Sequence, residues 1–289
     1  MKSFREQLKL TKPGIALLLD LVALTTFSMG LRNLDLIWKV GPLLFAGTAA
    51  SFSSSLLNNF IDMDIDNRMK RTSWRSKYAN NRAYILSISL LLLSSMIITV
   101  IFLNVITAVW IISGFLSYSI LYTLILKRNT QWNIVIGGIA GSFPALAGWS
   151  SVNTPISFAS LFVAIIVFLW TPTHFWSLAI KYRDDYSKAG VPMMPSMVPE
   201  KRAVQYILAN TIVLGALSMT PIFFDFGFPS TYKFVIIPLT IYLLYEVSVL
   251  YPKRGKELAK SAIKAFLASN WYLTGVLIGI IIGEVVVLA

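Results

Sequence analysis

The sequence NNFIDMDID, residues 58–66, ends a strongly apolar segment and is followed by a run of basic residues. Asn58, Asp62 and Asp66 recur every four residues, so on a helix they stack along one face, one turn apart. Proteins hold Mg²⁺ with oxygen ligands, commonly one or two carboxylates together with the phosphate oxygens of a substrate. The pattern therefore predicts a Mg²⁺ site formed by these three residues, where a helix within the membrane reaches the membrane surface.

The composition indicates a membrane protein. Of the 289 residues, 56% are hydrophobic and 13% charged, whereas about 25% are charged in a typical soluble domain. Several apolar runs exceed the ~18 residues that suggest a transmembrane helix. We predict an all-α polytopic membrane protein with a single domain, residues 1–289, and nine transmembrane helices in one bundle. The predicted spans are 14–31, 39–60, 83–103, 105–126, 133–151, 156–180, 203–222, 232–251 and 265–287.

The distribution of positive charge indicates how the chain is oriented. With these spans, all but three of the 25 Lys and Arg residues fall on one side of the membrane, the exceptions being Arg32, Lys39 and Lys233. The positive-inside rule then predicts a cytoplasmic N-terminus and an external C-terminus. The net charge of +12 thus reflects topology and contact with anionic lipids, and we expect no nucleic-acid partner. The expected location is the cell membrane, with the active site on the cytoplasmic side. The absence of cysteine excludes disulfides and thiolate metal sites.

The acidic motif has a second interpretation. A solvated helix end, paired with the arginines that follow, would have a similar composition, but the matching spacing on the continuation of a span favours a metal site. Asp64 lies on the opposite helical face and fits a partner of Arg68 or Arg71 better than a metal ligand. The basic residues of the loop 61–82 favour an anionic ligand beside the metal, as a lipid diphosphate would be.

A second polar centre occupies residues 169–195, LWTPTHFWSLAIKYRDDYSKAGVPMMP. Pro172 breaks the hydrogen-bond ladder within a span, which is tolerated where a helix lines a cavity. His174 is the only histidine. It is either a satisfied polar residue between helices or a contact for a planar, cofactor-like substrate or its iron. Asp184 and Asp185 are adjacent, so only one of them is expected to face the site.

Several separate blocks carry a family resemblance. They are LTKP at 10–13, the spaced motif 58–66 with MKRT at 69–72, GGIAG at 137–141 with Pro144 and Gly148-Trp149, WTPTHFW at 170–176, and DYSKAGVPMMP at 185–195. From about residue 10 to 280 the chain resembles the protohaem IX farnesyltransferases, a branch of the UbiA-type intramembrane prenyltransferases. It departs from the family at Ser76, where a proline usually follows the second arginine. It also has only the Asp184-Asp185 pair where other UbiA-type enzymes have a second spaced Asp motif.

The resemblance implies transfer of a farnesyl group from farnesyl diphosphate to a vinyl group of haem b, with addition of water, to give haem O and diphosphate. Mg²⁺ is the implied cofactor, and a downstream haem-modifying membrane enzyme is a candidate partner. The implied catalytic residues are Asn58, Asp62, Asp66 and Arg71, and the first three of these are the implied metal ligands. The implied substrate-binding residues are Lys12, Lys70, Arg75, His174, Lys181, Arg183, Asp185 and Tyr186.

Two other functions are compatible with these residues. One is prenyl transfer to another acceptor, such as a quinone precursor. The other is a transporter or a non-catalytic lipid-binding membrane protein that uses the acids for an ion. Transporters usually place their ion sites near the bilayer midplane on broken helices. The acid clusters here lie at the membrane edge instead, which favours the enzyme.

Overall fold

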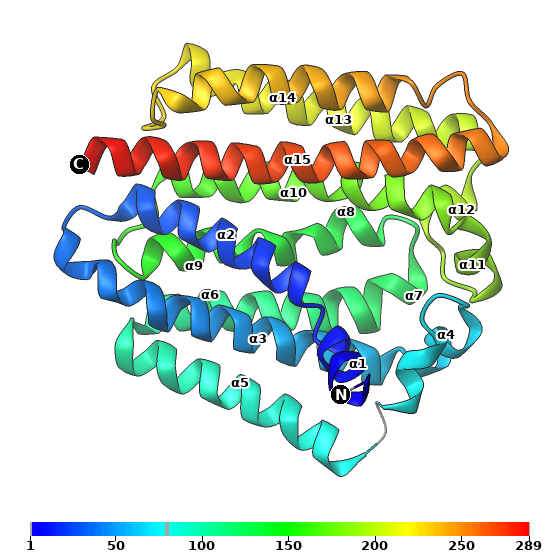
Figure 1. The fold of residues 1–289 in the computed structure, drawn as a ribbon, viewed down its shortest axis with the longest axis horizontal. Coiled ribbons are helices and arrows are strands. Elements are labelled where there is room, and N and C mark those ends of the chain that lie inside the picture. Colours follow the sequence, from blue (N-terminus) through cyan, green and yellow to red (C-terminus); the bar gives the residue numbers. More distant parts are fainter. Residues whose placement is uncertain (1, 79–80, 289) are drawn as a thin grey trace.

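The computed structural model of the chain describes residues 2–78 and 81–288. These residues form helices, turns and loops, with no strand among them, as the hydropathy pattern predicts. The long helices run side by side and form most of the molecule (Figure 1). They are α2 (Pro13–Gly30), α3 (Val40–Ile61), α5 (Arg82–Phe102), α6 (Val105–Leu116), α10 (Phe158–Lys181), α13 (Glu200–Phe223), α14 (Thr231–Ser248) and α15 (Gly255–Leu288).

Short helices connect or extend the long ones. They are α1 (Lys2–Leu10), η1 (Leu34–Lys39), α4 (Met63–Arg68), η2 (Ser73–Lys77), η3 (Ser117–Leu126), α7 (Lys127–Asn129), α8 (Asn133–Gly137), η4 (Gly138–Gly141), α9 (Phe143–Ser150), α11 (Arg183–Lys188) and α12 (Met194–Met197). One of them, η3, is a π-helix that continues α6. The others are short, with nine residues or fewer each.

Seven helical segments of the described chain are long and apolar enough to cross a membrane. They are Pro13–Gly30, Leu34–Ile61, Arg82–Phe102, Val105–Asn129, Phe158–Lys181, Glu200–Phe223 and Gly255–Val286. The chain is therefore a multi-pass membrane protein, and the count of nine spans stays a prediction.

Two predicted spans are absent from these seven. The first, 133–151, is divided into α8, η4 and α9, and two of its glycines pack closely against α10. A β-carbon added to Gly138 would lie 3.2 Å from the Thr171 side chain of α10, and one on Gly141 would lie 3.3 Å from Val167. The second, 232–251, corresponds to α14, which includes Lys233 and lies along α13 and α15 (Figure 1).

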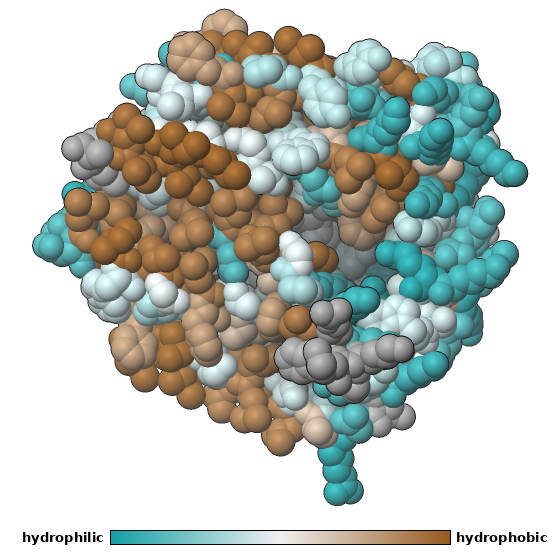
Figure 2. Space-filling view, viewed as in Figure 1, coloured by the Kyte–Doolittle hydropathy of each residue, from teal (hydrophilic) through white to brown (hydrophobic). Residues whose placement is uncertain are grey.

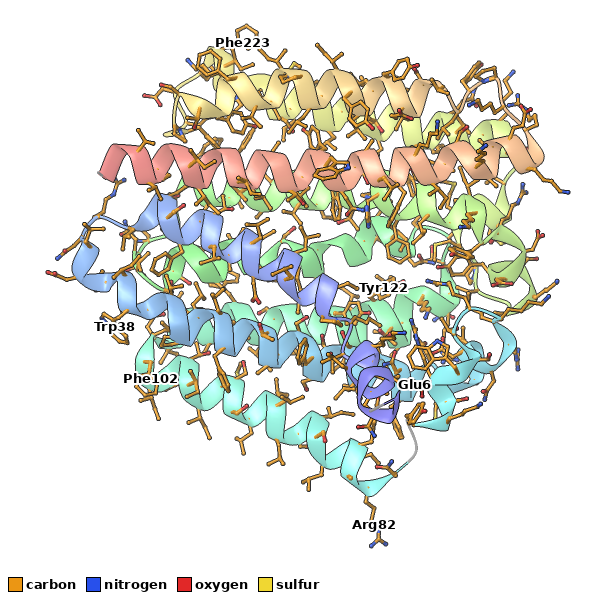
Figure 3. The ribbon with its side chains drawn as sticks, in the orientation of Figure 1. Glu6, Trp38, Arg82, Phe102, Tyr122 and Phe223 are labelled. Carbon is orange, nitrogen blue, oxygen red and sulfur yellow. The ribbon has the colours of Figure 1, made fainter. Side chains whose placement is uncertain are left out.

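The two ends of the bundle differ in polarity. We call the end formed by α1, α4, η2, α7, α11 and α12 the polar end. The N-terminus lies near it, and the C-terminus lies at the opposite end (Figure 1). Hydrophilic residues gather chiefly over the polar end, whereas hydrophobic residues cover much of the remaining face (Figure 2). Trp38, Phe102 and Phe223 lie toward the opposite end with their side chains outward (Figure 3), where a lipid environment would solvate them.

Helices α2 and α9 approach each other closely at Gly148. A β-carbon at this position would overlap the carbonyl oxygen of Ala23 and the hydroxyl of Thr26. Because the first of these obstacles is backbone, it cannot rotate away. This contact fixes the distance between α2, which leads out of the polar end, and the α9 segment of the divided span.

We expect Gly148→Ala to destabilise the protein by about 1–3 kcal/mol, the usual cost of overpacking. Thermal unfolding in detergent would measure the loss. Gly41→Ala on α3 is the matched control, because nothing lies within 4 Å of a β-carbon there. Equal melting temperatures for the two variants would contradict the close approach of α2 and α9.

Candidate active site

The acidic motif lies at the polar end, where α3 passes into α4. The backbone keeps helical hydrogen bonds through the junction: Asp62 N–H donates to the Asn58 carbonyl at 2.9 Å, and Asp66 N–H donates to the Asp62 carbonyl at 2.8 Å. The three side chains therefore share one face, as their spacing predicts. Asn58, Asp62 and Asp66 are only 4%, 1% and 3% exposed. A solvated acidic helix end would be open to water, so this interpretation does not fit.

Two cations from the end of the η3–α7 segment neutralise this face. Lys127 Nζ lies 2.5 Å from Asp62 Oδ2, and Arg128 Nη2 lies 3.7 Å from Asp62 Oδ1. Arg128 also holds Asp64 in a two-pronged pair at 2.7 and 2.8 Å. This hydrogen-bonded pair lowers the pKa of the Asp64 carboxyl to about 2. Asp64 is thus an ion-pair partner away from the buried face, although its partner is Arg128 and not the predicted Arg68 or Arg71.

The amide of Asn58 is oriented by its neighbours. Its Nδ2 donates to Asp62 Oδ2 at 2.7 Å and to Thr123 Oγ1 at 3.1 Å. Its Oδ1 accepts a hydrogen bond from Lys12 Nζ at 2.6 Å. Because an amide has a single oxygen, the atom that could bind a metal is bound to an ammonium group in this arrangement. Burial lowers the pKa of Lys12 to about 7, and the nearby Arg75 lowers it further, against the opposing effect of Asp62 and Asp66.

Several buried polar atoms of this region have no hydrogen-bond partner. They are Asp62 Oδ1, Asp66 Oδ2, Thr72 Oγ1 and Arg75 Nε. Arg75 reaches Asp66 only at 3.7 Å. Buried groups of this kind are costly unless something binds them. Two carboxylate oxygens that lack a donor fit a divalent cation, and a guanidinium nitrogen that lacks an acceptor fits a phosphate oxygen.

The oxygen ligands that the protein offers fit a metal ion that is also bound by a substrate. No group of three or more His, Cys, Asp or Glu side chains close enough to hold a metal occurs in the described part of the chain. Asp62 and Asp66 supply two carboxylates, so the remaining ligands would come from water and from substrate oxygens, as is usual for Mg²⁺.

The second polar loop meets the first through Arg71. The Arg71 guanidinium lies 4.7 Å from the centre of the Tyr182 ring. Burial raises the pKa of Tyr186, while the neighbouring guanidinium groups of Arg71 and Arg75 oppose that rise. The arginine loop after α4 and helix α11 therefore form one surface, which joins the two centres that lie about 120 residues apart in the sequence.

Other predicted residues of these loops are less closely involved. Lys70 and Lys181 are exposed, and Asp185 is half-buried. Arg183 turns toward the next loop, where it donates to the Val198 carbonyl at 3.0 Å and lies 3.8 Å from Glu200. The structure thus does not bring Arg183 to the acidic motif.

Sequence reasoning missed Tyr118 and Thr123, which lie in the π-helix η3, and Lys127, which directly follows it. The Lys127 N–H bonds to the Tyr122 carbonyl, and the Thr123 hydroxyl donates to the Tyr118 carbonyl at 2.8 Å. Residues five apart are stacked in a π-helix, but lie about 140° apart in an α-helix with 3.6 residues per turn. A 3.6-residue pattern therefore assigns Tyr118 and Thr123 to different faces. The available signal was a pair of basic residues, 127–128, at the end of the span nearest the acidic motif.

His174 is a residue of α10, and its side chain packs against α15. Its ring stacks on Trp170 with centroids 4.2 Å apart, and its Nδ1 is 2.9 Å from Ser269 Oγ. The Ser269 hydroxyl donates its own proton to the Phe266 carbonyl at 2.7 Å. The imidazole must therefore donate through Nδ1, which leaves the lone pair of the neutral ring on Nε2. The helix-packing interpretation accounts for one nitrogen and leaves the other available to a ligand.

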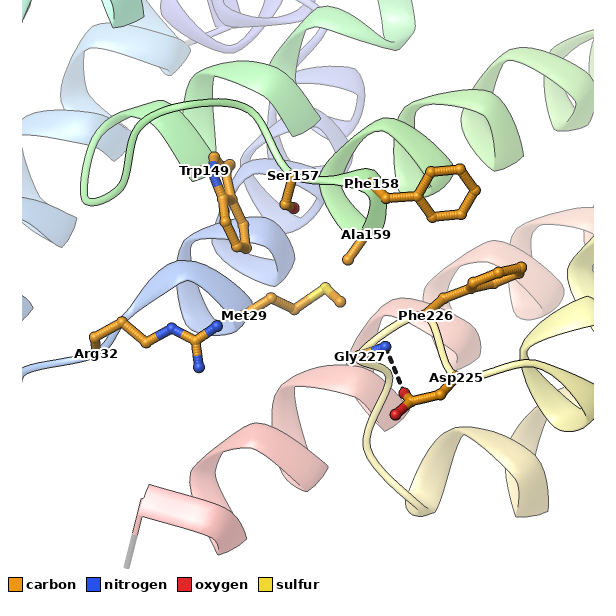
Figure 4. A pocket seen from close by; sticks show the side chains of 9 residues that line it. All are labelled: Met29, Arg32, Trp149, Ser157, Phe158, Ala159, Asp225, Phe226 and Gly227. Carbon is orange, nitrogen blue, oxygen red and sulfur yellow. Dashed lines mark hydrogen bonds between the residues drawn. The ribbon is translucent and has the colours of Figure 1, made fainter.

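A separate pocket of about 360 Å³ lies at the opposite end of the bundle (Figure 4). It is lined by Met29, Arg32, Trp149, Ser157, Phe158, Ala159, Asp225, Phe226 and Gly227. None of these residues belongs to the acidic motif or to the loops around it, so the pocket is distinct from the candidate active site.

Comparison with known proteins identifies the family. The UbiA prenyltransferase family matches residues 21–270, a range that includes the acidic motif and both polar loops. The chain belongs to the UbiA prenyltransferase family. It is accordingly a membrane-embedded prenyltransferase, as the sequence blocks indicate.

Full-length relatives of this prenyltransferase carry a narrower name. "Protoheme IX farnesyltransferase 2" of Picrophilus torridus is 44% identical over 280 residues, which cover 95% of this chain and 96% of the relative. "Protoheme IX farnesyltransferase" of Saccharolobus islandicus is 33% identical and covers 99% of both chains.

Solved structures agree on the fold of this prenyltransferase. A digeranylgeranylglyceryl phosphate synthase superposes with a TM-score of 0.72 at 16% identity, covering 99% of both chains. A UbiA homologue from Archaeoglobus fulgidus, solved with DMAPP and Mg²⁺, has a TM-score of 0.68 at 15% identity and covers 95% of this chain and 98% of its own. The all-helical UbiA fold is thereby confirmed.

The buried pair Lys127–Asp62 makes a testable prediction for the stability of this prenyltransferase. Lys127→Met should destabilise the protein by up to about 3–5 kcal/mol, because it leaves a buried carboxylate without its closest cation. Adding Asp62→Asn in the same chain should restore part of the loss, with a coupling above about 1 kcal/mol. Thermal unfolding of both single variants and the double variant measures this coupling. Strictly additive effects would mean that the two groups do not interact.

Proposed function

We propose that this UbiA-family protein transfers a farnesyl group from farnesyl diphosphate to a vinyl group of haem b to give haem O. The names of full-length relatives at 44% and 33% identity support this reaction. One structural observation carries it: two buried carboxylate oxygens that lack a donor lie at a site where the Arg75 Nε lacks an acceptor. A divalent cation with a diphosphate would satisfy both needs at once.

The chemistry requires a leaving group to be stabilised. The allylic C–O bond breaks and its electron pair leaves with diphosphate, so negative charge develops on the phosphate oxygens. Mg²⁺, which Asp62 and Asp66 would hold, would offset that charge. Arg71 and Arg75 would add forked hydrogen bonds to phosphate oxygens, and Lys70 and Lys127 would add positive charge. The site would face the cytoplasm, because this end carries most of the basic residues.

The farnesyl cation must be kept from water until the vinyl group reaches it. Tyr118 and Tyr122 stack with ring centroids 5.7 Å apart next to the acidic motif, and Figure 3 shows Tyr122 in the interior of the bundle. Aromatic faces stabilise a nearby cation. The vinyl carbon would then bond to the farnesyl carbon. Water would add to the resulting porphyrin-side cation and lose a proton, which leaves a hydroxyl group.

Haem would be held by residues of the second centre. The free lone pair on His174 Nε2 suits the haem iron, since neutral imidazole is a common iron ligand. The propionates need cations, and the exposed Lys181 is available, whereas Arg183 is engaged with Val198 and Glu200. Asp185 and Tyr186 would line the passage between the haem and the diphosphate.

Membranes that contain the wild-type chain, supplied with haem b and farnesyl diphosphate, should yield haem O by mass spectrometry of the extracted haems. Asp62→Asn should reduce the yield at least about 100-fold, as expected when a group that stabilises the transition state is lost. Asp64→Asn is the matched control, because its side chain is 52% exposed and paired with Arg128; it should retain most of the yield. Unmodified haem b with the wild type would refute the haem reaction, and a prenylated quinone precursor in the same membranes would identify the alternative acceptor.

His174→Ala should change the absorption spectrum of haem b bound to the purified protein, because an iron ligand is removed. Ser269→Ala keeps the imidazole but removes the acceptor of its Nδ1 proton, so a smaller spectral shift is expected. Identical spectra for the wild type and His174→Ala would show that His174 only packs between the helices.

A further inference from the structure

Lys12 has an unusual backbone conformation between α1 and α2. It has φ 54° and ψ 58° and is the only non-glycine residue with positive φ in the described parts of the chain. This left-handed region is unfavourable for a side chain with a β-carbon. The following residue is Pro13, which restricts Lys12 further. Such strain persists only where the surroundings hold it in place.

Contacts on both sides of the turn hold Lys12. The Leu10 carbonyl accepts a hydrogen bond from Asn59 Nδ2 at 2.9 Å, which ties the end of α1 to α3. The Lys12 ammonium donates to Asn58 Oδ1 at 2.6 Å and to the Tyr118 hydroxyl at 3.1 Å. The left-handed turn therefore directs the ammonium into the buried acidic face and not toward water.

The ammonium takes an atom that a metal would need. Asn58 Oδ1 is the only oxygen of that amide, and Lys12 is bound to it. Removing Lys12 from that oxygen would free Asn58 Oδ1 to act as a third oxygen ligand beside Asp62 and Asp66. Lys127 is a different case, because it continues η3 directly and binds the carboxylate of Asp62.

The geometry points to Lys12 as a tethered cation that competes with the divalent metal for Asn58 and is drawn away by the diphosphate. When a prenyl diphosphate enters, its oxygens attract the ammonium, Asn58 Oδ1 becomes free, and the metal binds against three protein oxygens. This inference rests on the proposed use of a metal and a prenyl diphosphate at this site. It makes Lys12 a positioning residue that couples the two ligands.

Such a coupling has a defined sign. Without diphosphate, the ammonium weakens metal binding. With diphosphate, it strengthens the binding of both ligands, and the diphosphate raises the affinity for the metal by the same factor as the metal raises the affinity for the diphosphate. A lysine that served only as a fixed structural counterion would remain on Asn58 whether or not diphosphate was bound. A lysine that served only to bind phosphate would not affect the metal when phosphate is absent.

The test measures binding of Mn²⁺, in place of Mg²⁺, to the purified protein by calorimetry. Each protein is measured with and without a non-reactive thiolo analogue of farnesyl diphosphate. In the absence of the analogue, Lys12→Met should bind Mn²⁺ about tenfold more tightly than the wild type, within the usual range of coupling between sites. In its presence the wild type should gain affinity for Mn²⁺, and Lys12→Met should gain much less. Unchanged or weaker Mn²⁺ binding by Lys12→Met without the analogue would overturn the proposal.

Two further variants separate this effect from simple loss of charge or of folding. Lys9→Met removes an exposed lysine of α1 and should leave Mn²⁺ affinity unchanged. Tyr118→Phe removes no charge but releases one of the two contacts of Lys12, so it should tighten Mn²⁺ binding by a smaller factor. If Lys12→Met fails to fold, Tyr118→Phe serves as the test instead. An unchanged Mn²⁺ affinity in Tyr118→Phe then overturns the proposal. Production of haem O by the wild type is scored separately, so failure of the proposed reaction is distinguished from failure of this coupling.

Discussion

A carboxylate out of contact with water needs compensation by a cation, and this requirement shapes the polar end of the bundle. Asp62 and Asp66 are almost completely buried, so positive groups must approach from other segments. Lys127 comes from the end of the fourth apolar segment, Arg75 from the loop after α4, and Lys12 from the turn between α1 and α2. Each contact links a different part of the chain to the junction of α3 and α4. The helices are thus held at this end by the same charges that surround the proposed metal and diphosphate site.

The remaining unsatisfied atoms show that this compensation is incomplete. Asp62 Oδ1 and Asp66 Oδ2 lack donors although cations surround them. A fully paired cluster would be more stable by itself, but it would have no capacity to bind a ligand. The incomplete pairing distinguishes a binding site from a structural ion-pair network, and it is more informative than the presence of acids and arginines alone.

Much of this arrangement could be predicted from the sequence. The four-residue spacing placed Asn58, Asp62 and Asp66 on one face, because the helical hydrogen bonds continue across the junction of α3 and α4. Hydropathy predicted an all-helical membrane protein, but it could not reveal that the span 133–151 is divided, since a mean hydropathy does not record where helical hydrogen bonds are interrupted. The proximity of Tyr118 and Thr123 was missed because the π-helix changes the angle between successive residues. The orientation of the Asn58 amide depends on Lys12, 46 residues away, and no local pattern records it.

The π-helical segment of residues 117–126 also affects how related chains can be compared. A π-turn has one residue more than the α-turn that could replace it, and the flanking helix can keep its place in the bundle. A relative with a one-residue gap in this segment would align well on both sides, yet it would direct different side chains to the acidic motif. Sequence identity across the span therefore does not guarantee the same site. In this part of the chain, the register of the π-helix and not the residue type decides which hydroxyl and ammonium groups meet the face of Asn58, Asp62 and Asp66.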